Sequence, residues 1–321
     1  VRPDAPIRIL LTGHMDTVFP VDHPFQAQKW LKPGILNGPG VADMKGGIAV
    51  MLAALTAIES LKEGTTLGYD VVINSDEEVG SPSSAALLRQ AAAGKIAAFT
   101  YEPALPDGTL AGARAGSGNF SIIVTGRSAH AGRNPEDGRN ALLAAADLAL
   151  RLKAGSGVGF SCNPARIDGG GPNNVVPDHA VLRVNFRPKT PMDEVAARAL
   201  LDRCITDVAQ EHDVTMHLHG GFGRPPKPMD EKAARLFGLV RDCGTDLGLS
   251  LGWRDTGGVC DGNNIAATGI SVVDTMGVRG GNIHSDTEFL ITDSLIERAQ
   301  LSALALIRIA QGHYMRGGTA A

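Results

Sequence analysis

Four short apolar runs, each leading into histidine or acidic residues, constrain the fold more than any other feature of the sequence. The runs span residues 7–12, 70–75, 97–101 and 270–274, and helical patterns fall between them. Runs of this length and composition are typical of strands that are buried on both faces of a parallel sheet. The alternation predicts an α/β fold with a mostly parallel sheet and helices on both of its faces.

Three helices are predicted around these strands. Residues 45–61 carry apolar side chains at a period near 3.6 and should end by Gly64. Ser81 followed by Pro82 is typical of a helix start, with Gly94 as the end of that helix. Residues 293–310 form a long amphipathic pattern.

The middle of the chain has a different pattern. Residues 120–125, 181–187 and 214–219 alternate like half-exposed strands, and Asn134-Pro135 and Thr190-Pro191 are expected to open two helices. The order strand, helix, strand, strand, helix, strand predicts a smaller α+β lid domain, bracketed by glycine-rich hinges. We therefore expect a discontinuous domain of residues 1–113 and 224–321, interrupted by a lid of residues 114–223.

Composition excludes some classes of partner. The formal net charge is −4, with 30 basic residues against 34 acidic ones, which gives no electrostatic case for nucleic acid. No uninterrupted apolar run approaches the roughly 20 residues that span a bilayer, so we expect no membrane partner. Four scattered cysteines without a C-x-x-C pair are expected to be reduced core thiols. The chain begins at Val1 without an initiator methionine or a signal-like segment. We expect a cytoplasmic location and keep a periplasmic one as the alternative.

The polar residues at the strand ends are the candidates for chemistry. They are His14 and Asp16 after the first strand, Asp76, Glu77 and Glu78 after the second, Glu102 after the third, and His284 after the fourth. The carboxyl ends of parallel strands share one edge of an open sheet, and ligands bind there. Asp43 lies just before a predicted helix and can reach the same edge. Two imidazoles among several carboxylates favour zinc, manganese or cobalt over calcium or magnesium.

This set offers more ligands than one zinc ion needs, which indicates two divalent ions that share a bridging carboxylate. Two such ions would lower the pKa of a water and polarise a substrate carbonyl. The Glu77–Glu78 pair can supply one ligand and one proton acceptor, because successive residues point in different directions. Asp16 can accept the proton on the second nitrogen of His14 and so fix its tautomer.

At these motifs the sequence resembles the metallopeptidase family of glutamate carboxypeptidase, acetylornithine deacetylase and succinyl-diaminopimelate desuccinylase. The matching segments are residues 13–17, 38–47, 76–80, 128–132 and 283–286, in family order over nearly the whole chain. Tyr101-Glu102-Pro103 is most similar to the glutamate carboxypeptidase branch.

The resemblance implies a role for each residue of the metal centre. One ion would be held by Asp43, His14 and Glu102, and the other by Asp43, Glu78 and His284, with Asp43 as the bridge. Glu77 would be the general base and Asp16 the carboxylate that orients His14. Both ions are expected to be Zn²⁺, with Co²⁺ or Mn²⁺ as alternatives. The family match, with the place of Asp43 before a helix, also leads us to expect a cis peptide between Asp43 and Met44.

The resemblance also implies roles for the lid. His130 would reach the active site of a partner subunit and support the developing oxyanion, in a homodimer formed through the lid domains. Asn174 and Arg187 would hold the carboxylate of the substrate, and Arg114, Ser117 and Arg224 match further substrate-contacting positions. Val259 and Cys260 stand where relatives often have Gly, Thr or Ser, which leaves the accepted side chain open.

The expected reaction is hydrolysis of a peptide-like amide that releases a C-terminal amino acid, glutamate-like by resemblance, through water activated by two metal ions. Removal of the acyl group from an N-acyl amino acid, as in acetylornithine deacetylase or the desuccinylase, uses the same machinery and is the alternative. A non-catalytic metal-binding dimer is a further alternative, which the presence of Glu77 disfavours. A two-metal phosphoesterase is disfavoured because nothing in the sequence resembles an arginine-rich phosphate cradle.

Overall fold

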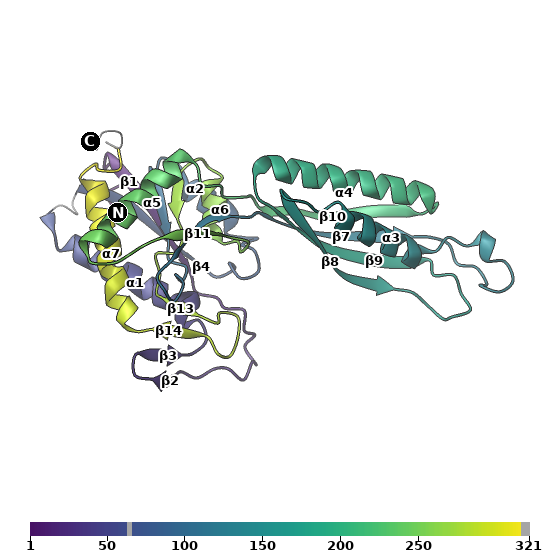
Figure 1. Cartoon of the computed structure of the whole chain (residues 1–321), viewed down its shortest axis with the longest axis horizontal. Coiled ribbons are helices and arrows are strands. Elements are labelled where there is room, and N and C mark those ends of the chain that lie inside the picture. Colours follow the sequence, from purple (N-terminus) through teal and green to yellow (C-terminus); the bar gives the residue numbers. More distant parts are fainter. Residues whose placement is uncertain (63–65, 316–321) are drawn as a thin grey trace. The chain divides into compact units, whose positions relative to one another are not determined.

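The computed structural model describes residues 1–62 and 66–315, and the chain divides into two compact units (Figure 1). The first unit comprises Val1–Arg114 and Pro228–Ala321, and the second comprises Ala115–Lys227. Arg114 therefore falls in the first unit and Arg224 in the second, whereas the predicted boundaries placed them the other way round. The mixed α/β fold agrees with the prediction, and the expected helix end at Gly64 lies outside the described residues.

The first unit is built on a parallel sheet of four strands. Their order is β12 (Ser271–Val273), β5 (Ala97–Thr100), β1 (Ile7–His14) and β4 (Leu67–Asn74). These are the four predicted runs. β4 stands last in the sheet and exposes Val71 and Ile73, so that this run is not buried on both faces as expected.

Each face of the sheet has its own apolar core. Successive residues of a strand point to opposite faces, so Ile9 and Leu11 of β1 belong to one core and Leu10 belongs to the other. The first core includes residues of α1 (Gly46–Glu59), α5 (Glu231–Asp246) and α7 (Asp293–Ala310). The second includes residues of α2 (Ala85–Ala92) and α6 (Asp261–Ala266). The prediction of helices on both faces is confirmed.

The segment Val41–Glu59, which contains α1, is long and apolar enough to cross a membrane. Most of its apolar window is nevertheless buried inside the protein. Val50, Met51, Ala54 and Ile58 are part of the core that α1 shares with α7. The composition of α1 is therefore that of a core helix.

Two small sheets complete the first unit. β6 (Leu110–Arg114) pairs in parallel with β11 (Trp253–Thr256). An antiparallel sheet has the order β13 (Gly280–Gly281), β14 (Phe289–Ile291), β3 (Ile35–Asn37) and β2 (Lys29–Lys32). The turn between β13 and β14 carries His284, so this sheet anchors the last of the predicted ligands.

The second unit is an antiparallel sheet with two helices on one face. The strand order is β10 (Thr215–Arg224), β7 (Ser117–Thr125), β9 (His179–Pro188) and β8 (Phe160–Gly169). The helices α3 (Ala141–Ala154) and α4 (Pro191–Glu211) share one apolar core with the sheet. Along the chain the elements follow the predicted order of strand, helix, strand, strand, helix and strand.

One of the two helix starts predicted for this unit is wrong. Thr190 caps α4 as expected, because its side chain accepts a hydrogen bond from the Asp193 amide. Asn134-Pro135 opens only the single turn η3 (Pro135–Asp137), and α3 begins after Asn140 instead. The Asn140 side chain accepts from the Leu143 amide, which makes it the cap that the helix uses.

Leu11 and Val71 offer a matched test of this packing, because they pair in register on β1 and β4. Leu11 is fully buried, whereas Val71 is 39% exposed. We expect Leu11→Ala to lower the free energy of unfolding by about 2–5 kcal/mol, since it leaves a cavity in the core. Val71→Ala should lower it by less than about 1.5 kcal/mol. Urea unfolding followed by circular dichroism measures both, and equal losses would contradict the assignment of β4 to the sheet edge.

Candidate metal centre

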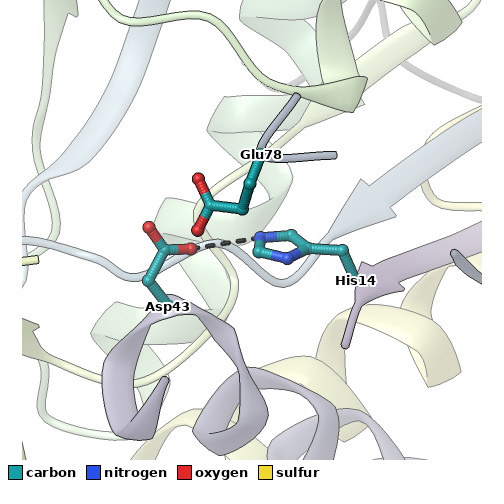
Figure 2. A group of neighbouring side chains, drawn as sticks. All are labelled: His14, Asp43 and Glu78. Atoms are coloured by element: carbon teal, nitrogen blue, oxygen red, sulfur yellow. Dashed lines mark hydrogen bonds and ion pairs between the residues drawn. The ribbon is translucent and has the colours of Figure 1, made fainter. Parts of the chain in front are cut away.

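The carboxyl edge of the parallel sheet carries a cluster of imidazole and carboxylate groups. His14 is the last residue of β1, Glu77 and Glu78 follow β4, and Glu102 follows β5. Ligand atoms of His14, Asp43 and Glu78 lie within 4.8 Å of one another. Figure 2 shows the carboxylates of Asp43 and Glu78 gathered around the imidazole of His14.

Asp43 lies between the two predicted histidines. Its Oδ1 is 3.1 Å from His14 Nε2, and its Oδ2 is 3.3 Å from His284 Nε2. His14 Nε2 also lies 3.8 Å from Glu102 Oε1, and His284 Nε2 lies 3.3 Å from Glu78 Oε2. The five residues thus form two groups that share Asp43, with mixed nitrogen and oxygen donors in each. This donor set fits two divalent cations.

The two groups differ in depth. The side chain of His14 is 1% exposed, and Asp43 and Glu102 are buried beside it. The side chain of His284 is 52% exposed. A cation between His14 and Glu102 would therefore lie deeper in the protein than one between His284 and Glu78.

The carboxylates of the cluster favour positive charge on the neighbouring histidines, and the directions of the pKa shifts indicate this. Burial alone would lower the pKa of His14, but hydrogen bonds to Asp43 and Glu102 raise that pKa to about 12. Hydrogen bonds to Asp43 and Glu78 raise the pKa of His284 to about 10 against the effect of burial. Burial raises the pKa of Glu102 to about 8, and the charges of Asp43 and Glu77 add to this effect while His14 opposes it. Protonated imidazoles thus supply charge that a divalent cation would also supply.

Asp16 connects His14 to the loop after β4. His14 Nδ1 lies 3.2 Å from the Asp16 backbone oxygen and 3.3 Å from Asp16 Oδ1. Asp16 Oδ2 accepts a hydrogen bond of 3.0 Å from the Glu78 amide. In the neutral form of His14, a proton on Nδ1 that is donated to Asp16 would leave Nε2 free to bind a cation in the cluster.

A short π-helical turn, η1 (Val41–Lys45), brings Asp43 to the sheet edge just before α1. The peptide bond between Asp43 and Met44 is cis, as expected from the sequence. The first turn of α1 then approaches β5 closely, since a Cβ on Gly47 would lie 1.9 Å from the carbonyl oxygen of Tyr101. Only glycine fits this contact, and it allows Asp43 to lie near Glu102, the residue after Tyr101.

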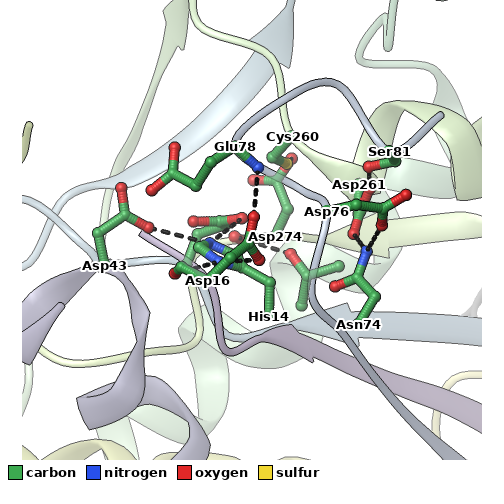
Figure 3. A network of polar contacts seen from close by, with 12 residues as sticks. His14, Asp16, Asp43, Asn74, Asp76, Glu78, Ser81, Cys260, Asp261 and Asp274 are labelled. Carbon is green, nitrogen blue, oxygen red and sulfur yellow. Dashed lines mark hydrogen bonds and ion pairs between the residues drawn. The ribbon is translucent and has the colours of Figure 1, made fainter. Parts of the chain in front are cut away.

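Further carboxylates hold the loop that carries Glu77 and Glu78 (Figure 3). Asp76 Oδ2 accepts from the Ser84 amide at 3.1 Å. Asp261 Oδ2 accepts from Asn74 Nδ2 at 2.7 Å, and Asp261 Oδ1 accepts from the Ser81 hydroxyl. These bonds keep Ser81 in a turn, and α2 begins at Ala85 rather than at Pro82 as predicted.

A buried ion pair lies in the same unit. Arg114 Nε donates to Asp274 Oδ2 at 2.7 Å, and Arg114 Nη1 donates to the Gly258 carbonyl at 3.2 Å. The Cys260 thiol contacts the same Asp274 oxygen at 3.6 Å. Asp274 raises the pKa of Arg114 above its ordinary value, against the effect of burial. Sequence reasoning missed Asp274, although an acidic residue at the end of a predicted apolar strand was the available signal.

The other predicted site residues lie in the second unit, and the structure brings two of them together. The Ala131 amide donates to the Asn174 carbonyl at 2.9 Å, and His130 pairs with Val175 in a single β-bridge. His130 Nδ1 accepts from the Gly132 amide at 3.1 Å. The segments of His130 and Asn174 therefore lie side by side in this unit.

Ser117, Arg187 and Arg224 form a second group in that unit. Arg224 pairs with Ser117 between β10 and β7. Asn185 connects Ser117 to Arg187, with Nδ2 donating to the Ser117 hydroxyl at 3.2 Å and Oδ1 accepting from Arg187 Nε at 2.8 Å. Burial and the charge of Arg224 lower the pKa of Arg187.

Comparison with known protein families identifies the family of this chain. The model of peptidase family M20/M25/M40 matches residues 10–308. The chain belongs to this family.

Members of peptidase family M20 are similar to this chain in sequence and in fold. Carboxypeptidase G2 from Pseudomonas sp. (strain RS-16) is 31% identical over 313 residues, which cover 93% of this chain and 73% of that protein. Succinyl-diaminopimelate desuccinylase from Psychrobacter arcticus is 29% identical over 321 residues, which cover 91% of this chain and 76% of that protein. A tripeptidase structure from Staphylococcus aureus superposes with a TM-score of 0.79 at 25% identity, over 97% of this chain and 82% of that one.

A dinuclear metal-binding M20 peptidase from Bacillus subtilis superposes with a TM-score of 0.74 at 18% identity, over 97% of this chain and 83% of that one, and shows the shared fold. Membership of the M20 family confirms the resemblance and the class of activity expected from the sequence, metal-dependent hydrolysis of an amide bond. The named relatives include a carboxypeptidase and a desuccinylase, so family membership does not choose between these substrates.

The Arg114–Asp274 pair can be tested for its contribution to stability in this M20 chain. We expect Asp274→Ala to lower the free energy of unfolding by about 3–5 kcal/mol, because it leaves a buried guanidinium without its counter-charge. Replacing both residues, Arg114→Met with Asp274→Leu, should be milder. Asp202→Ala removes an exposed partner of Arg198 and should change stability by about 1 kcal/mol or less. Chemical unfolding measures all three, and a milder effect for Asp274→Ala than for the double variant would contradict this account.

Proposed function

We propose that this chain is a dinuclear metal-dependent carboxypeptidase, which releases a C-terminal amino acid from a peptide-like amide. The observation that supports it best is Asp43, whose two carboxylate oxygens each face a different imidazole. His14 and Glu102 complete one proposed cation site, and Glu78 and His284 complete the other. When bound, two divalent cations, Zn²⁺ first with Co²⁺ or Mn²⁺ as alternatives, would polarise the amide carbonyl and lower the pKa of the attacking water.

Glu77 is the proposed general base. It is 8% exposed, directly precedes Glu78, and lies close enough to Glu102 for its charge to raise the pKa of that residue. In the proposed reaction Glu77 takes a proton from the attacking water and returns it to the leaving amide nitrogen. Asp16 fixes the ring of His14 and, through the Glu78 amide, the loop that carries the base.

The second unit supplies the proposed recognition of the substrate carboxylate. Burial and the charge of Arg224 lower the pKa of Arg187, and the Arg187 guanidinium is proposed to bind this carboxylate through paired hydrogen bonds. Ser117 and Asn174 are proposed to contribute polar contacts from the same unit, and Arg114 one from the first. A C-terminal peptide and an N-acyl amino acid both present a free carboxylate. The 31% identity with carboxypeptidase G2 favours the former, and the 29% identity with the desuccinylase keeps the latter as the second candidate.

A substrate panel tests this choice. Purified protein with added Zn²⁺ is incubated with peptides that end in acidic, basic or apolar amino acids, and with N-acetyl and N-succinyl amino acids. Release of free amine is then measured. We expect release from peptides with an acidic C-terminal residue; release from the N-acyl substrates alone would select the deacylase, and no release from any substrate would contradict both.

Glu77→Gln keeps the shape of the side chain but removes the base. We expect turnover to fall by roughly 10²–10⁴-fold, because proton transfer to and from Glu77 is lost. Metal content, measured by elemental analysis, should stay at the wild-type value, since Glu77 is not a proposed ligand. Turnover near that of the wild type would remove Glu77 from the mechanism.

We also propose that the second unit pairs with its equivalent in a homodimer, and that His130 acts in the active site of the partner subunit. His130 is exposed and belongs to a different unit from every proposed cation ligand. In the proposed dimer its imidazole supports the oxyanion that develops on the substrate carbonyl.

Subunit mixing tests the composite site. His130→Ala and Glu77→Gln proteins, each inactive alone, are mixed in equal amounts under conditions that allow exchange. Half of the dimers are then mixed, and one of the two sites in each has both an intact base and an intact histidine. We therefore expect about a quarter of wild-type activity. If His130 acts in its own subunit, the mixture stays as inactive as its parents.

A further inference from the structure

Glu288 is a buried carboxylate that the proposed reaction does not use. It directly precedes β14 in the first unit and is 1% exposed. Its Oε2 accepts a hydrogen bond of 3.0 Å from the Gly40 amide. Its Oε1 accepts from the amides of Ala42 at 2.9 Å and Asp43 at 3.0 Å. With three N–H donors on its two oxygens, the side chain is oriented towards the backbone of the turn rather than towards the cluster.

The three amides belong to the turn that carries Asp43. Backbone amides at the start of a helix have no hydrogen-bond partner within the helix. Here the Glu288 carboxylate accepts from the amide of Gly40, just before η1, and from those of Ala42 and Asp43, within it. Gly40 adopts a left-handed backbone with φ 69°, and a Cβ there would lie 2.6 Å from Lys45 Nζ and 2.8 Å from Thr17 Cγ2. The position of the Asp43 backbone therefore depends on Glu288.

The same residue also fixes the turn that carries His284. Asn37 Nδ2 donates to the carbonyl of Glu288 at 2.6 Å and to that of Asp286 at 3.1 Å. The Glu288 amide donates to the Ser285 carbonyl at 3.1 Å, which closes the turn. His284 has a left-handed backbone with φ 65°, which is uncommon for a residue other than glycine and needs such support.

We propose that Glu288 is a positioning residue that fixes the separation of Asp43 and His284. Its side chain holds the backbone of one, and its main chain, through Asn37, holds the turn of the other. The inference rests on the proposed dinuclear centre and adds a residue that contacts neither cation nor substrate. Because Asp43 is the proposed shared ligand, a disturbance at Glu288 should weaken the binding of both cations.

Glu288→Gln is the sharpest variant. It retains one oxygen for the Ala42 and Asp43 amides and places an amide N–H against the Gly40 N–H, where two donors oppose each other. Loss of an outer partner of a ligand typically weakens metal affinity by about 10–100-fold. We expect a change of this size for Zn²⁺, and a larger one for Glu288→Ala. Glu231→Gln, an exposed residue at the start of α5, is the matched control and should leave the affinity unchanged.

The experiment measures Zn²⁺ affinity by chelator competition, together with amide hydrogen exchange over residues 38–45. Weaker binding with faster exchange in that segment, at unchanged circular dichroism, is the expected result. Wild-type affinity in Glu288→Gln would overturn the inference. So would a lower melting temperature of the metal-free protein at unchanged affinity, since Glu288 would then be purely structural.

Asn37→Ala provides a second test if Glu288→Gln does not fold. It releases the His284 turn while leaving the Glu288 side chain in place. We therefore expect weaker binding of the ion proposed between Glu78 and His284, and little change for the ion proposed between His14 and Glu102. Two ions bound with wild-type affinity in Asn37→Ala would then overturn the inference. A wild-type protein that binds no Zn²⁺, Co²⁺ or Mn²⁺ would instead refute the proposed centre itself, and the inference with it. The two failures are therefore distinguishable.

Discussion

The parallel pairing of β1 with both β4 and β5 is the constraint on which the candidate metal centre depends. In this register His14 lies opposite Asn74, and Thr12 lies opposite Thr100. The three strands therefore end at the same edge, and the loops that follow them begin within reach of one another. An antiparallel β4 would carry its acidic loop to the far edge of the sheet. The parallel direction of the strands thus brings the loops to one edge, and the residue types in those loops then determine the chemistry that is possible there.

Behind the reactive groups lies a second set of carboxylates that bind backbone and hydroxyl donors. Its members are Asp16, Asp76, Asp261 and Glu288, and each accepts hydrogen bonds from a loop or turn of the site. Burying a carboxylate is unfavourable unless donors compensate it, and here the donors are the amides and hydroxyls of the segments that need fixing. These bonds hold backbone conformations that are uncommon outside glycine, such as the positive φ of Ser81 and His284. Acidic residues in this protein therefore serve two purposes, and position in the fold separates them.

The sequence was sufficient for the features that depend on local pattern. Strand ends marked by His14 and Glu102, and the alternating strands of the second unit, could be predicted because each signal lies within a few neighbouring residues. Features set by distant residues could not. The exposure of Val71 depends on β4 being last in the sheet, and the partner of Arg114 is Asp274, which lies 160 positions away. Competing caps explain the misplaced start of α3, where Asn140 is used instead of Asn134.

The interruption of the first unit has a consequence for the order in which the protein is made. The second unit is one continuous segment and can fold while Pro228–Ala321 is still being synthesised. Until that part emerges, β5 lacks its neighbour β12, and the apolar side of α1 lacks α7. The acidic edge of the sheet also lacks His284 throughout this interval. A nascent chain at the ribosome therefore presents a parallel sheet of three strands with exposed core residues, and the imidazole–carboxylate cluster can be completed only after the segment that carries His284 has been synthesised.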